Sequence, residues 1–230
     1  MELAYDVTGE GPPLVLVHGL GSSRRCWDLV TDDLSRDFTV FAVDLPGHGE
    51  TAAMPGLDAV PPALLASALG EFMDARGIDR AHMAGNSLGG WTVLEAAADG
   101  RALSVVALCP AGLWIPSNTV NKTVDFNRRA AVATRKAIPS IMKVPALRRS
   151  LMRAGAERAA TVPYDIAVGA GVAQADASGF AEARNGALGN RFDRADRLGD
   201  RACRGLGRNR TALAHAAFDQ RSEEHTSELQ

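Results

Sequence analysis

The feature that most constrains the fold is a serine between small residues, placed where a strand pattern gives way to a helix pattern. Gly85-Asn86-Ser87-Leu88-Gly89 has the form G-x-S-x-G; Ala81 to Ala84 before it predicts a strand, and Leu88 to Ala98 after it predicts a helix. A turn this tight forces the serine into a strained backbone conformation, and Gly85 and Gly89 let neighbouring backbone pass close by. Ser87 is therefore a candidate nucleophile at the end of a strand, although a chance Gly-x-Ser-x-Gly in a loop is the alternative.

Strand and helix patterns alternate through the first half of the chain. Apolar, β-branched runs predict three further strands, and apolar residues at helical spacing predict two further helices. The strands are expected at Leu14 to His18, Thr39 to Val43 and Leu103 to Leu108, and the helices from Ser22 or Ser23 to about Arg36 and from Pro61 to Gly77. This alternation predicts an α/β fold with a doubly wound, mostly parallel sheet.

The character of the sequence changes after Gly112. From about Trp114 to Arg197 it is compatible with helices, basic in patches and without a convincing strand, which predicts a helical cap insertion over the open edge of the sheet. We therefore divide the chain into residues 1–112, the sheet-forming core; 113–198, the helical cap; 199–220, a segment that breaks the pattern; and 221–230, a tail that does not resemble the rest.

A second motif, His18-Gly19-Leu20-Gly21, follows the first apolar strand. Here the chain must turn so that one backbone N–H faces the candidate nucleophile. The N–H groups of Leu20 and Leu88 are predicted to form an oxyanion hole, in which the loss of one donor typically costs ~2.7–4 kcal/mol of transition-state stabilisation. His18 is interpreted as a brace for this loop rather than as a catalytic base.

These motifs together resemble the α/β-hydrolase family from about Tyr5 to Arg197. The residues that carry the resemblance are His18-Gly19-Leu20-Gly21, Asp44-Leu45-Pro46-Gly47-His48-Gly49 and Gly85-Asn86-Ser87-Leu88-Gly89-Gly90. The resemblance implies cleavage of a small ester or related acyl substrate by a Ser-His-Asp triad, without a cofactor. It also implies a structural role for His48, and it disfavours haloalkane dehalogenases and epoxide hydrolases, which place an aspartate where Ser87 stands.

Composition excludes several other classes. The formal net charge is −2, so the chain as a whole has no pull toward nucleic acid or an anionic membrane surface. Cys26, Cys109 and Cys203 are too few and too scattered for a disulfide framework or a metal cluster. The N-terminus lacks a signal-peptide pattern and no apolar run approaches the ~20 residues of a membrane span, so a cytoplasmic location is expected. His82, Trp27 and Trp91 are expected to pack in or near the core.

The triad pattern fails in the C-terminal part of the chain. The family places its acid after a later strand and its histidine near the C-terminus, yet no apolar strand pattern follows Gly199. Codons for Arg201 to Arg208, read one base later, can spell Val-Pro-Val-Val-Ala-Trp-Gly-Glu, a strand of the expected kind. A frameshift near Gly199 is our hypothesis, and residues 221–230 resemble a translated sequencing adapter. The triad acid and histidine would then be missing from this chain.

Other interpretations of this region remain open. His215 with Asp200 has the right order after Ser87 to complete a triad, although the surrounding strand is absent. The arginine-rich stretch could be a nucleic-acid-binding tail, but it lacks interleaved aromatic residues. There are two alternatives to an enzyme. One is a hydrolase-fold protein that binds a small apolar ligand without turnover, and the other is an inactive fragment. The oligomeric state does not follow from the sequence.

Overall fold

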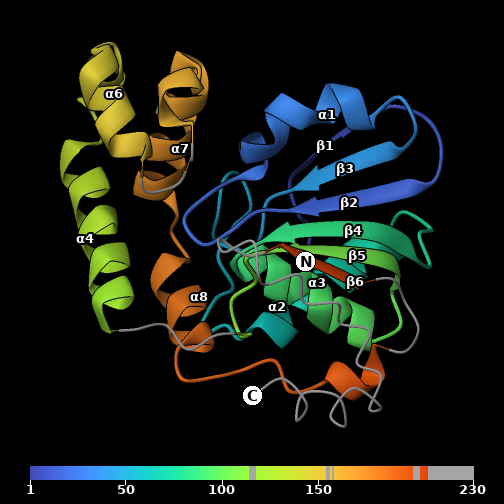
Figure 1. The fold of residues 1–230 in the computed structure, drawn as a ribbon. Helices are drawn as coiled ribbons and strands as arrows, with labels where there is room; N and C mark the ends of the chain where they lie inside the picture. Colours follow the sequence, from blue (N-terminus) through green and yellow to red (C-terminus); the bar gives the residue numbers. More distant parts are fainter. Residues whose placement is uncertain (114–117, 154–155, 157, 199–202, 207–230) are drawn as a thin grey trace, which may run out of the picture.

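The computed structural model describes residues 1–113, 122–153, 156 and 158–198, together with the backbone of 118–121 and 203–206. Its centre is a six-stranded sheet in the order β1-β3-β2-β4-β5-β6, in which only β1 runs antiparallel to its neighbour (Figure 1). The strands are β1 (Tyr5–Thr8), β2 (Pro13–Val17), β3 (Thr39–Val43), β4 (Ala81–Asn86), β5 (Ala102–Leu108) and β6 (Cys203–Leu206). The predicted doubly wound, mostly parallel α/β sheet is confirmed.

Both faces of the sheet are covered by helices. Val15 and Val17 of β2 belong to the core shared with α2 and α3, whereas Leu14 and Leu16 face the opposite way, toward Trp27. This alternation explains the continuous apolar run, because a strand buried on both faces has no polar side. The helices of this part are η1 (Arg24–Trp27), α1 (Asp28–Leu34), α2 (Pro62–Asp74) and α3 (Leu88–Ala98). Trp27 and Trp91 are both buried, as predicted.

Two strands were not predicted from the sequence. All four residues of β1 are exposed, so this edge strand has no buried face to give an apolar pattern. The expectation that 199–220 contains no strand was wrong for Cys203–Leu206, which pairs in parallel with Val105–Leu108 of β5. Backbone pairing explains the difference, because the edge of β5 offers unpaired N–H and C=O groups to any extended segment.

The described part of 118–198 is helical and contains no strand. Its elements are α4 (Asn118–Thr134), α5 (Ile138–Met142), α6 (Pro145–Met152), η2 (Ala159–Thr161), α7 (Tyr164–Asp176), α8 (Phe180–Ala187) and η3 (Ala195–Arg197). Helices α4, α6, α7 and α8 lie beyond the carboxyl ends of β2 and β3, where Gly179 N–H donates to the Gly47 carbonyl at 2.9 Å and the Phe180 ring packs on Gly21 (Figure 1). The short η3 turn instead contacts α3. None of the described helices is both long and apolar enough to cross a membrane.

Candidate active site

Ser87 lies in the strained turn between β4 and α3. Its backbone angles are φ 52° and ψ −112°. Among the described non-glycine residues, Ser87 and Cys109 are the two with a positive φ. Backbone hydrogen bonds hold this conformation: Ser87 N–H donates to Leu108 at 2.9 Å, and the Ser87 carbonyl accepts from Trp91 at 3.1 Å and Ala111 at 2.9 Å. Strain fixed by surrounding structure in this way is typical of functional sites.

The two glycines of the motif are required by the packing of backbone on backbone. A Cβ added at Gly85 would lie 2.2 Å from the Gly89 carbonyl oxygen, and one added at Gly89 would lie 2.3 Å from the carbonyl oxygens of Val17 and His18. The first turn of α3 therefore rests directly on the end of β2. This geometry agrees with the prediction that Gly85 and Gly89 let neighbouring backbone pass close by.

Gly89→Ala is expected to destabilise the protein by about 3 kcal/mol, because carbonyl groups of two backbone elements cannot move aside for the new methyl group. Gly70 is the matched control, since it lies inside α2 with no atom near its added Cβ. Gly70→Ala is expected to stabilise the helix by roughly 0.5–1 kcal/mol. Urea unfolding measures both changes, and two substitutions with the same sign would contradict the packing argument.

The loop between β2 and η1, residues 18–23, lies against the serine and is called the Gly19 loop. Ser22 N–H donates to the Gly19 carbonyl at 3.1 Å, and Gly21 has a φ of 70°, so the loop is a β-turn with Leu20 at its second position. A Cβ at Gly19 would be 3.3 Å from the Ser87 Cβ. Leu88 is the first residue of α3, and N–H groups of a first helical turn have no partner within the helix.

His18 is fully buried, and both of its ring nitrogens form hydrogen bonds with backbone groups of neighbouring loops. Nδ1 lies 2.8 Å from the Gly19 carbonyl oxygen and so carries the proton, while Nε2 accepts the Leu45 N–H at 3.0 Å. Burial, with a smaller contribution from His48, lowers the pKa of His18 to about 3. This neutral, immobilised ring supports the interpretation of His18 as a brace.

A buried ion cluster, which the sequence analysis did not identify, anchors the same loop. Asp44 is completely buried; it accepts the Arg24 N–H at 2.7 Å and the Glu50 N–H at 3.0 Å, and it pairs with the Arg24 guanidinium. Arg24 also binds Glu50 at 2.7 Å and Asp6 at 2.8 Å. Burial opposes the charge of Arg24, but these carboxylates together raise its pKa above the usual value.

The described residues place no base beside Ser87. Its hydroxyl has no hydrogen-bond partner among them, His48 Nδ1 binds the Pro46 carbonyl at 3.0 Å, and His82 Nδ1 binds Ser104 Oγ at 2.8 Å. The candidate pair Asp200 and His215 lies outside the described residues. Within the described ranges, no cluster of His, Cys, Asp or Glu is arranged to hold a metal ion.

A strained serine at a strand–helix turn, on a doubly wound sheet, defines the class to which this chain belongs. It is a member of the alpha/beta hydrolase family, whose sequence profile matches residues 14–224.

Curated relatives match the first half of the chain. A 115-residue segment is 37% identical to the dihydrolipoyllysine-residue acetyltransferase component of the acetoin cleaving system of Cupriavidus necator, covering 49% of this chain and 30% of that protein. A 114-residue segment is 33% identical to pimeloyl-(acyl-carrier protein) methyl ester esterase of Chromobacterium violaceum, covering 48% of this chain and 42% of that protein. The matches thus span less than half the length of these relatives.

Among solved structures, a thermophilic esterase from Thermogutta terrifontis superposes with a TM-score of 0.62 at 24% identity, covering 89% of this chain and 73% of the esterase. At this identity the likeness concerns the fold.

Proposed function

We propose that the natural gene product is a serine hydrolase that cleaves an ester or related acyl substrate, with Ser87 as nucleophile. The observation that carries this proposal is the strained backbone of Ser87, with φ 52° at the β4–α3 junction and the Gly19 loop against its side chain. Family membership and the esterase fold among its neighbours support hydrolysis as the reaction class.

The proposed reaction begins with attack of the Ser87 hydroxyl oxygen on the substrate carbonyl carbon. A histidine takes the serine proton, and the N–H groups of Leu20 and Leu88 hold the oxyanion of the tetrahedral intermediate. The proton passes to the leaving alcohol as the bond to it breaks, and water then releases the acyl group from Ser87. The closeness of Gly19 to Ser87 and the first-turn position of Leu88 support these two donors.

The described residues do not supply the histidine and the acid of the catalytic triad. We propose that they are encoded in the frame next to the one read after Gly199, as the codons for 201–208 suggest. We also propose that residues 113–198 form the cap that selects the substrate, because helices α7 and α8 lie over the ends of β2 and β3.

A second candidate function is capture of a small apolar ligand without turnover. The absence of a described partner for the Ser87 hydroxyl favours it, since a serine without a base is a weak nucleophile. Saturable binding without product release, in a version with the restored frame, distinguishes this candidate from the hydrolase.

The proposal is tested with a fluorophosphonate probe on the version read in the neighbouring frame after codon 200. We expect one modified residue, Ser87, located by mass spectrometry of the digest, and no modification of the Ser87→Ala variant. Circular dichroism shows whether each protein is folded. A folded protein that reacts at no serine would remove the support for a nucleophilic Ser87.

A further inference from the structure

The helices farthest from the sheet carry a positive charge that the chain total conceals. Residues 118–153 contain nine Lys and Arg residues and one acidic residue, Asp125, which gives this segment a formal charge of +8. Because the whole chain carries −2, the remaining residues carry −10. The expectation of no attraction to an anionic surface rested on the total charge, which does not describe this segment.

Three of the nine cations have structural partners inside the helical segment. Arg128 donates to the carbonyls of Gln174 and Ala177, Arg135 pairs with Asp176, and Arg148 donates to the carbonyl of Met142. The other six are exposed and form no ion pair with any residue that the structure describes. They are Lys122, Arg129, Lys136, Lys143, Arg149 and Arg153.

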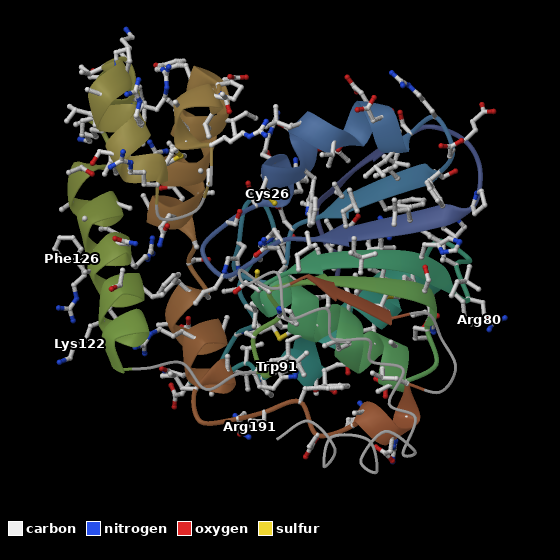
Figure 2. All side chains as sticks on the ribbon, in the orientation of Figure 1. Cys26, Arg80, Trp91, Lys122, Phe126 and Arg191 are labelled. Atoms are coloured by element: carbon white, nitrogen blue, oxygen red, sulfur yellow. The ribbon has the colours of Figure 1, made fainter. Side chains whose placement is uncertain are left out.

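Large apolar side chains are exposed between these cations. Phe126 on α4 is 70% exposed, and it shares one face of the helix with Lys122 and Arg129, at spacings of four and three residues. Figure 2 shows Lys122 and Phe126 pointing away from α7 and α8. The other exposed apolar residues of this segment are Val132 (51%), Val144 (45%), which precedes α6, and Leu147 (48%) and Leu151 (52%), which share one side of α6.

We propose that the outer surface of α4, α6 and the turns beside them, which carries the six free cations and five exposed apolar residues named above, binds the surface of an anionic lipid bilayer. Helices that lie in a membrane interface combine Lys and Arg with exposed Phe and Leu, so that cations meet lipid phosphates while apolar side chains enter the acyl boundary. α4 and α6 form the edge of the molecule farthest from the sheet (Figure 1), so both can contact a flat surface without obstruction from the strands.

The arrangement of side chains on this surface favours a bilayer over an acidic protein. On α4, Phe126 lies between Lys122 and Arg129 on one face of the helix, whereas a protein interface gathers its apolar side chains in a central patch with a polar rim.

Sedimentation of the full chain with vesicles tests the proposal. We expect binding to vesicles of equal parts phosphatidylcholine and phosphatidylglycerol, no binding to phosphatidylcholine alone, and loss of binding at high salt. Reversing three charges, with Lys122→Glu, Arg129→Glu and Lys136→Glu, is expected to weaken binding by at least about 100-fold. The matched control reverses the exposed Arg25, Arg36 and Arg80 and is expected to leave binding nearly unchanged.

Insertion of α4 is measured separately, with Phe126→Trp. Its fluorescence is expected to shift to shorter wavelength on addition of anionic vesicles, whereas that of Leu29→Trp, at a 62% exposed position on α1, is not. This result decides the matter if the triple variant fails to fold. Absence of vesicle binding, equal weakening in both triple variants, or binding to polyglutamate in preference to vesicles would overturn the proposal, the last in favour of an acidic protein partner.

Discussion

Ester hydrolysis by the version read one base later from codon 201 is expected to exceed that of the present chain by at least about 10³-fold in kcat/KM. The reason is that a serine hydrolase without its histidine keeps only the acceleration that comes from the oxyanion hole and substrate binding. Resequencing the source DNA through this region comes first, and hydrolysis of p-nitrophenyl esters of increasing chain length then measures the gain.

Ser87→Ala in the restored version is the control for this result. It is expected to return the rate to the level of the present chain, because the members of a triad act as a unit and the loss of one removes most of the benefit of the others. Equal rates in the two versions, or DNA that confirms the present reading, would contradict the frameshift hypothesis. His215 and Asp200 would then be the next pair to substitute.

The parts of the fold that were predictable are those in which burial determines the residue type. Thr39–Val43 and Leu88–Ala98 have the predicted bounds, because a strand buried on both faces and a helix after a glycine turn leave clear patterns. The exposed strand β1 leaves no such pattern, since its register with β3 comes from backbone hydrogen bonds. For the same reason β6 was not foreseen. The boundaries proposed for the cap remain predictions.

The site shows the same division between local and long-range information. The strained turn at Ser87 and the close approach at Gly89 follow from a motif of five consecutive residues, so sequence alone identifies them. The ion cluster around Asp44 joins residues that are 6 to 26 positions apart, and nothing in the sequence around Arg24 indicates that its side chain is buried. Pairing of this kind is established only by the fold.

Asp44→Ala is expected to lower the free energy of unfolding by about 3–5 kcal/mol, among the largest losses for a single side chain in this protein. Removal of the carboxylate leaves the buried guanidinium of Arg24 without its buried partner, and a buried charge that loses its partner is far more costly than a lost surface pair. It also frees the Arg24 and Glu50 N–H groups, so the Gly19 loop loses its attachment to the end of β3.

The matched controls are the two other carboxylates that bind the same guanidinium. Asp6 and Glu50 have side chains that are 58% and 73% exposed, so Asp6→Ala and Glu50→Ala are each expected to cost no more than about 1 kcal/mol. Urea unfolding of the three variants, with unchanged m-values, gives the comparison directly. Similar losses in all three would mean that the cluster acts as an exposed network. A loss confined to Asp44 would assign the anchoring of the Gly19 loop, and with it the Leu20 amide, to this one buried carboxylate.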